Sequence, residues 1–238
     1  AFVALDEQGE RSFSFYRPPS ADILFRPHHF DQEILRAASI FHVCSNSMTD
    51  QDIAEATYEG MQRARAMGAT ISFDINLRPM LWPEGADAAK VVWGALALSD
   101  VVKVSKVELD WLCETSGEDS ATVIKRLWEG HAQLLVVTDG DNPIVWHTRA
   151  QSAEVEVFRV LTQDTTAAGD AFVGGFLFKL ARNLKMGTPL SAFCQDSSMV
   201  SESLRFAAAV GALAVTKRGA FAAMPTLEEV NIMINEQI

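Results

Sequence analysis

The chain of 238 residues has few cysteines: Cys44, Cys113 and Cys194, three in all and far apart. An odd number at such wide spacing argues against a metal cluster built on thiolates. It fits a reduced protein of the cytoplasm, where free thiols persist. We therefore expect the three cysteines to be packing residues without a catalytic role.

Long apolar runs are also absent. Crossing a bilayer takes roughly 18 to 20 consecutive apolar residues, whereas the best candidate here, residues 206–215, is short and contains Gly211. The chain starts on a strand-like segment, without a charged leader or cleavage site. We therefore expect a protein that is neither exported nor inserted into a membrane.

Basic residues are scarce. The sequence has 20 Lys and Arg against 31 Asp and Glu, a formal net charge of −11. Nucleic acids and anionic membranes are bound through basic surface, so neither is expected as the main partner. Any polyanionic small ligand would need a local binding site, and the 48% of hydrophobic residues is enough for the core of one large α/β domain.

Strand-like and helix-like segments alternate along most of the chain. Strands are expected at residues 40–43, 70–74, 101–104 and 134–138, and helices from about 31, at 50–67, at 203–216 and from 226. Strands separated by helices imply parallel crossover units. In such a sheet ligands collect beyond the carboxyl ends of the strands, so functional residues are expected there.

The N-terminal residues have a different pattern. Residues 1–5 and 11–16 flank a turn, DEQGE, and Phe13 and Phe15 alternate with polar neighbours. This pattern is typical of a two-stranded hairpin with one bare face. Exposed aromatic residues and free strand edges favour association with a partner.

The segment from Asp164 to Phe172, DTTAAGDAF, is the most informative in the chain. An apolar stripe with helical spacing follows it, so Ala168, Gly169 and Asp170 lie in the first turn of a helix. The unpaired N–H groups of such a turn bind anions, and small residues let a phosphate approach them. A carboxylate fixed there suits a base that takes a proton from an attacking hydroxyl, as in phosphoryl transfer. The alternative is a purely electrostatic helix cap.

Polar residues also follow two of the expected strands. Strand 70–74 runs into Asp74, Asn76 and Arg78. An Arg offers a planar fork of donors to phosphate oxygens, although a surface ion pair with an Asp would explain Arg78 too. Ser105 and Glu108 follow strand 101–104. Oxygen ligands suit Mg²⁺, but S-x-x-E is also the signature of a helix capping box.

Residues 164–170 closely resemble the D-T-x-G-A-G-D signature of the ribokinase-like sugar kinases, with Ala167 where that family usually has glycine. The resemblance implies a three-layer α/β sandwich with a mostly parallel central sheet and a small β-sheet lid. It implies an ATP-dependent sugar kinase in which Asp170 is the catalytic base. The backbone of Ala167, Ala168 and Gly169 would form the anion hole.

Other segments extend this resemblance. Asp74, Asn76 and Arg78 match the family's D-x-N-x-R segment, whose Arg lies near the sugar and the transferring phosphate. Ser105 and Glu108 resemble its N-x-x-E motif, in which the Glu acts on Mg²⁺ through water. The resemblance also implies which residues bind the nucleotide. These are Lys103, Ser105 and Glu108; Thr138 and Gly140 of a T-x-G turn; Gly169; and Ala208 and Gly211 of the segment that covers the adenine. Asp164 and Thr166, with residues 217–220, would line a site for a monovalent cation such as K⁺.

The sugar side resembles that of fructokinases. Phe15 and Arg17 match an aromatic-x-Arg pattern of fructokinases and 2-keto-3-deoxygluconate kinases, and residues 19–22 and 81–82 add to the likeness. We expect residues 1–22 to be part of the lid and residues 23–238 to form the nucleotide- and sugar-binding core. In the family a glycine-rich sugar segment comes earlier, so the natural protein is expected to begin before this chain does.

The expected activity is transfer of the γ-phosphoryl group of ATP, with Mg²⁺, to a hydroxyl of a ketohexose. The open alternatives are a 2-keto-3-deoxygluconate kinase, an aminoimidazole riboside kinase and a non-catalytic sugar-binding homologue. We expect a homodimer paired through the lids, unless preceding strands complete that sheet within one chain.

Overall fold

A computed structural model describes residues 2–5, 11–14 and 20–236. Its main sheet contains β3 (Ile40–Cys44), β4 (Thr70–Asp74), β5 (Val101–Ser105), β6 (Leu134–Asp139), β7 (Asn142–His147) and β8 (Ser152–Val155), in that spatial order. Strands β3 to β6 are parallel, as predicted. Strands β7 and β8 add an antiparallel edge that the sequence pattern did not predict.

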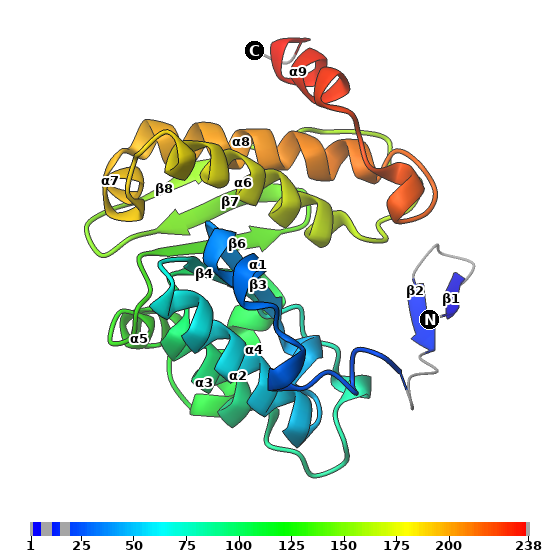
Figure 1. The fold of residues 1–238 in the computed structure, drawn as a ribbon. Helices are drawn as coiled ribbons and strands as arrows, with labels where there is room; N and C mark the ends of the chain where they lie inside the picture. Colours follow the sequence, from blue (N-terminus) through cyan, green and yellow to red (C-terminus); the bar gives the residue numbers. More distant parts are fainter. Residues whose placement is uncertain (1, 6–10, 15–19, 237–238) are drawn as a thin grey trace.

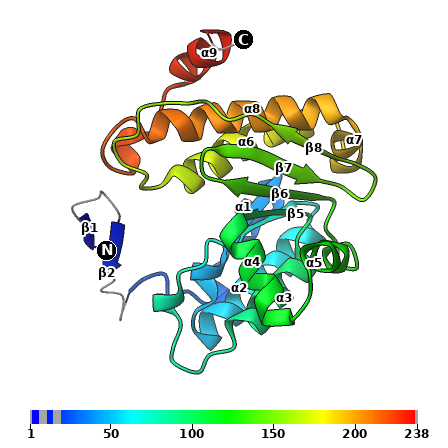
Figure 2. The same ribbon diagram turned by 180° about the vertical axis from the view of Figure 1, so that it is seen from behind.

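Helices cover both faces of this sheet, so the expected three-layer sandwich is confirmed. Figures 1 and 2 show one layer below the sheet, formed by α2 (Gln51–Ala66), α3 (Ala88–Leu98), α4 (Lys106–Ser116) and α5 (Ser120–Leu127). The layer above it contains α6 (Ala168–Lys185), α7 (Leu190–Gln195) and α8 (Ser197–Ala214). Helix α9 (Leu227–Glu236) follows α8, and α1 (Gln32–Ala37) precedes β3.

Helix α8 begins six residues before the expected start at 203, since its first residue is Ser197. The reason is a cap: the carboxylate of Asp196 accepts hydrogen bonds from the N–H groups of Ser198 and Met199, both at 3.0 Å. Among the helices of residues 20–236, none is long and apolar enough to cross a membrane.

The N-terminal hairpin forms as expected where it is described. Strands β1 (Phe2–Leu5) and β2 (Arg11–Ser14) are antiparallel and make a sheet of their own, which stands apart from the main sheet in Figures 1 and 2. Phe15 and Arg17 lie outside the described residues. The division into a lid and a core therefore stays a prediction.

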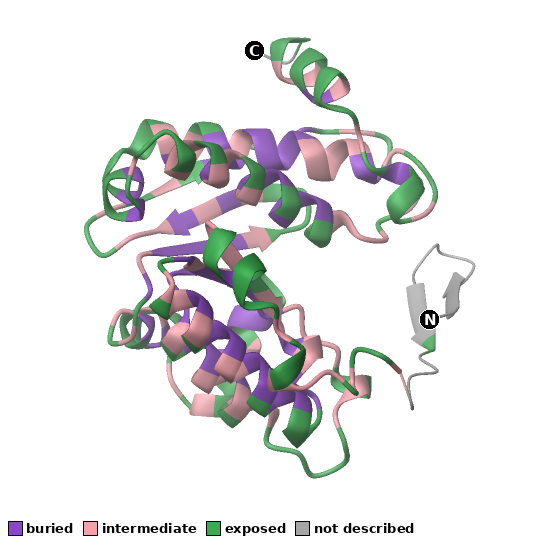
Figure 3. Cartoon of the chain, in the orientation of Figure 1, coloured by how far each residue is buried: buried purple, intermediate pink, exposed green. Residues whose placement is uncertain are grey.

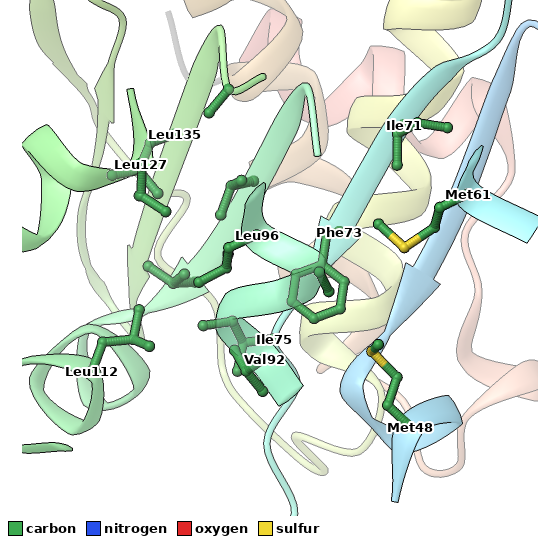
Figure 4. Packing of buried hydrophobic residues seen from close by; sticks show 14 of the residues in the cluster. Met48, Met61, Ile71, Phe73, Ile75, Val92, Leu96, Leu112, Leu127 and Leu135 are labelled. Carbon is green, nitrogen blue, oxygen red and sulfur yellow. The ribbon is translucent and has the colours of Figure 1, made fainter. Parts of the chain in front are cut away.

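Alternating residues of the central strands enter two separate cores. Val102, Val104 and Leu135 pack with α2 to α5, in the cluster shown in Figure 4. Val101 and Leu134 pack against the α6 and α8 layer. In Figure 3 buried segments, in purple, occur in the sheet and in the helices on both sides of it. Because side chains alternate along a strand, Lys103 of β5 lies on the face of Val101, toward α6.

The three cysteines are free thiols. Cys194 is buried, and burial raises the pKa of its thiol to about 12. Desolvation also raises the pKa of Cys44 and of Cys113. Neutral thiols are poor nucleophiles, which agrees with the packing role expected for them.

Helices α6 and α8 approach closely at glycines. A β-carbon built on Gly175 of α6 would lie 2.9 Å from Cγ2 of Val210 and 3.1 Å from Cα of Ala207, both on α8. Gly211 of α8 lies in turn against Phe172 of α6, with 3.5 Å between its built β-carbon and Cβ of Phe172. These contacts set the distance between α6 and α8.

We predict that Gly175→Ala lowers the free energy of unfolding by about 1 to 3 kcal/mol, the usual cost of overpacking a core. Gly174→Ala is the matched control, because nothing lies within 4 Å of its built β-carbon. It should raise stability by about 0.5 to 1 kcal/mol through helix propensity. Urea unfolding of both variants checks this, and equal midpoints would contradict the tight α6–α8 contact.

Candidate active site

Two strand ends and a helix start meet at the carboxyl edge of the sheet. Asp74 ends β4, Lys103 lies in β5, and Gly169 is in the first turn of α6. Nζ of Lys103 is 3.2 Å from Oδ1 and 3.4 Å from Oδ2 of Asp74. A β-carbon built on Gly169 would lie 3.7 Å from the same nitrogen. The structure thus brings Lys103 to the turn that was expected to bind phosphate.

Asn76, which was expected to contact the sugar, holds Asp170, the expected catalytic base. Nδ2 of Asn76 donates a hydrogen bond to Oδ1 of Asp170, at 3.2 Å. Asn76 itself has φ 42°, in the left-handed region that Asn tolerates better than most residues. Its N–H donates to Oδ1 of Asp74, at 3.2 Å. Asn76 therefore orients Asp170, while its contact with a sugar stays a prediction.

Asp74 is the residue whose part in this site the sequence analysis left unassigned. It is buried, and burial raises the pKa of its carboxyl to about 6. The ammonium of Lys103 lowers the pKa, whereas the negative charges of Glu108 and Asp170 raise it. The sequence offered one indication of this role: Asp74 is a carboxylate at the end of an apolar strand, and a buried charge there requires a partner.

The turn before α6 has an unusual conformation. Ala167, its N-cap, has φ 59° and ψ 16°, the left-handed conformation in which glycine is normally found. The carboxylate of Asp164 holds the turn, since it accepts the N–H of Thr166 at 2.9 Å and that of Gly219 at 3.0 Å. Asp164 and Thr166 thus lie beside the 217–220 segment, as expected. Gly169 and Asp170 are exposed, and both lie in the first turn of α6, where N–H groups have no partner inside the helix. The N–H of Ala168, which was expected to be part of the anion hole, instead donates to the carbonyl oxygen of Thr165, at 3.2 Å.

Glu108 forms the capping box that was the alternative to a magnesium role. Its Oε2 accepts the N–H of Ser105 at 2.7 Å, while Oγ of Ser105 accepts the N–H of Glu108 at 3.2 Å. Oε1 accepts the N–H of Leu77 at 2.8 Å. Glu108 therefore ties the loop after β4 to α4, and a role toward Mg²⁺ stays a prediction.

Arg78 lies on that same loop but outside this network. Its Nη1 donates to the carbonyl oxygen of Leu77, at 3.0 Å. Within residues 20–236 it forms no ion pair, so the structure does not show the surface pair with an Asp that was the alternative. Its role at the transferring phosphate stays a prediction.

The remaining nucleotide candidates divide into two groups. Thr138 is the last residue but one of β6, near the carboxyl edge, and Gly140, with φ 59°, lies in the turn into β7. Ala208 and Gly211 lie within α8, where Ala208 is buried in the core and Gly211 packs on α6. The structure brings none of these four into the hydrogen-bond network of Asp74 and Asp170 in the described chain, and their contact with a nucleotide stays a prediction.

Comparison with known proteins identifies the family. Residues 1–227 match the model of the pfkB family of carbohydrate kinases. The chain is 38% identical to probable fructokinase-3 of Arabidopsis thaliana over 237 residues, which cover 100% of the chain and 66% of that protein. The chain therefore spans about two thirds of the length of this curated relative.

Two solved structures are similar as well. Fructokinase with bound ATP from Xylella fastidiosa is 57% identical with a TM-score of 0.94, over 99% of this chain and 73% of that one. Aminoimidazole riboside kinase from Salmonella enterica, complexed with aminoimidazole riboside and an ATP analog, is 31% identical with a TM-score of 0.78, over 93% and 70%. The chain belongs to the pfkB family of carbohydrate kinases, and it has their ribokinase-like fold.

The left-handed alanine gives a direct test of strain in this turn. An L-residue in that conformation costs about 1 to 2 kcal/mol, so Ala167→Gly should raise the free energy of unfolding by about 1 kcal/mol. Ala168→Gly, one residue into the helix, should lower it by about 0.5 to 1 kcal/mol. Thermal unfolding of the pair checks the prediction, and a loss of stability in both variants would contradict it.

Asp74 should make stability depend on pH. Its pKa in the folded chain, about 6, exceeds the ordinary value of 3.8, so its stabilising contribution is present below about pH 4 and is lost as the pH rises through about 6. From pH 7 to pH 5 the wild type should therefore gain about 1 kcal/mol relative to Asp74→Asn, which does not titrate. The free energies of unfolding at both pH values test this, and a constant difference would show that Asp74 does not titrate in this range.

Proposed function

We propose that this chain forms the nucleotide-binding part and much of the sugar-binding part of an ATP-dependent fructokinase. The observation that carries the proposal is the position of Asp170 at the start of α6. Asp170 accepts a hydrogen bond from Asn76 and directly follows Gly169, which lies beside the ammonium of Lys103. A carboxylate, a cation and free helix N–H groups are the parts that phosphoryl transfer needs.

In the proposed reaction Asp170 accepts the proton of the attacking sugar hydroxyl. The hydroxyl oxygen forms a bond to the γ-phosphorus of ATP, and the bond from that phosphorus to the β–γ bridging oxygen breaks, leaving ADP. The hydrogen bond from Asn76 fixes the carboxylate of Asp170 for this transfer. The N–H group of Gly169 stabilises the negative charge of the transferring group, whereas the N–H of Ala168 donates to the carbonyl oxygen of Thr165, at 3.2 Å.

The charges around the site also favour a cation that arrives with the nucleotide. The negative charges of Glu108 and Asp170 both raise the pKa of the Asp74 carboxyl, and Lys103 balances only one of these three charges. No group of three His, Cys, Asp or Glu side chains suited to a metal ion occurs in the described part of the chain. We therefore assign Mg²⁺ mainly to the phosphates of ATP, with Glu108 acting through water; Mg²⁺ would neutralise phosphate charge.

Three further assignments belong to this proposal. Asp164 and Thr166, held against Gly219, would line a site for a monovalent cation such as K⁺. The free cysteines support a cytoplasmic location for the protein. We also keep the homodimer paired through the β1–β2 hairpin, whose edges are open to a partner in the described sheet.

Fructose is proposed as the acceptor because the more similar solved structure, at 57% identity, is a fructokinase, whereas the aminoimidazole riboside kinase is 31% identical. Turnover of the full-length protein with ATP and fructose, aminoimidazole riboside or 2-keto-3-deoxygluconate tests this choice. We expect the highest kcat/KM with fructose. Preference for either other compound would refute the fructokinase assignment but keep the kinase.

We predict that Asp170→Asn lowers kcat by on the order of 10²-fold or more, because the amide cannot accept the proton, while ATP binding persists. Asp196→Asn is a matched control, since Asp196 caps α8 away from this site. Near wild-type turnover of Asp170→Asn, measured by ADP release with fructose, would remove Asp170 from the mechanism.

A further inference from the structure

The cation that the structure places at the phosphate-binding turn is Lys103, not Arg78. We propose that Lys103 is a catalytic residue that contacts the γ-phosphoryl group during transfer, and that Asp74 is the positioning residue that sets both Lys103 and Asn76. This inference rests on the proposed function and deepens it.

The position and contacts of Lys103 suit a cation that binds an anionic ligand. Its side chain is only 12% exposed, and it lies on the sheet face that α6 covers. Its hydrogen bonds to Asp74, at 3.2 and 3.4 Å, are long for bonds between charged groups. An ammonium has three N–H donors, so one remains beyond the two contacts with Asp74. Gly169, whose built β-carbon is 3.7 Å away, lies beside the ammonium.

Neighbouring cations are engaged elsewhere. Arg78 donates to the carbonyl oxygen of Leu77. Lys106, at the start of α4, is half exposed and forms an ion pair with Asp110 of the same helix. A side chain that only balanced the buried charge of Asp74 would not need to lie beside the first turn of α6.

Asp74 connects the two sides of the site. One side of the network runs from its carboxylate to the ammonium of Lys103 and on to the turn at Gly169. The other runs from its Oδ1 to the N–H of Asn76, whose amide then holds Asp170. Asp74, a buried residue that is 3% exposed, thus fixes the base and the cation relative to each other.

The first experiment compares binding of a non-hydrolysable ATP analogue and of ADP by calorimetry. Lys103→Met keeps the apolar stem and removes the charge, so it should weaken the analogue at least tenfold more than ADP. Lys106→Met should change neither affinity. Equal losses for the analogue and ADP would show that Lys103 does not contact the γ-phosphoryl group, whatever the acceptor of the kinase is.

The second experiment is a double-mutant cycle on kcat with ATP and fructose. Lys103→Met should lower kcat by on the order of 10²-fold, as for other preorganised stabilising groups, with Lys103→Arg recovering part of the rate. Asp74→Asn should lower kcat about tenfold in the wild-type background and less than threefold in Lys103→Met, because positioning matters only when the ammonium is present. KM for fructose should stay within threefold.

Asn76→Gly tests the second side of the network, because glycine keeps the left-handed backbone and removes only the amide. It should lower kcat by the same factor in the wild type and in Lys103→Met, since it acts on Asp170.

Two outcomes would overturn the proposal. If the effects of Asp74→Asn and Lys103→Met on kcat simply multiply, Asp74 does not position Lys103. If kcat is unchanged in Lys103→Met, Lys103 is not a catalytic residue. A wild type that binds the analogue but phosphorylates no sugar would refute the proposed function, while the binding experiment would still decide the role of Lys103.

Discussion

The site depends on the buried ion pair between Asp74 and Lys103. An isolated charge in the interior is costly, whereas a pair with hydrogen bonds can be accommodated. Both side chains come from the α6 face of adjacent parallel strands, and their side chains are 4% and 12% exposed. Because the pair lies at the carboxyl edge, it links the loop after β4 to the start of α6. Removing one partner would leave the other charge buried and unpaired.

Backbone strain is concentrated around the base. Asn76 and Ala167 are the two non-glycine residues with positive φ in the described chain, and they flank Asp170 from separate segments. Each conformation is stabilised by a nearby carboxylate: Asp74 accepts the N–H of Asn76, and Asp164 accepts the N–H of Thr166, next to Ala167. Strained residues persist where the surroundings hold them, and they gather at functional sites.

Local patterns predicted the parts of the structure that local physics decides. The four parallel strands, the start of α6 and the place of Asp170 followed from apolar runs and small residues. Strand β7 did not, because Pro143 argues against a strand. Its missing N–H is tolerated because pairing of β7 with β8 starts at Ile144 and its pairing with β6 shifts register beyond Val137.

The contacts of the site were harder to predict than its members. Asp170 and Asn76 were both expected there, but their mutual hydrogen bond joins residues 94 positions apart. The pairing of Asp74 with Lys103 depends on the register of β4 on β5, which no local pattern specifies. The sequence likewise did not predict that Ala208 is buried in the core and that Gly211 packs on α6; their contact with a nucleotide stays a prediction.

Lys103 and the first turn of α6 should act as one anion-binding unit. NMR of the full chain tests this: it follows the ammonium signal of Lys103 and the amide signals of Gly169 and Asp170 during titration with a non-hydrolysable ATP analogue. We predict that all three signals shift with the same midpoint, and that the amide shifts become much smaller in Asp74→Asn. Amide shifts without any change at the Lys103 ammonium would show that Lys103 and the turn do not bind the anion together.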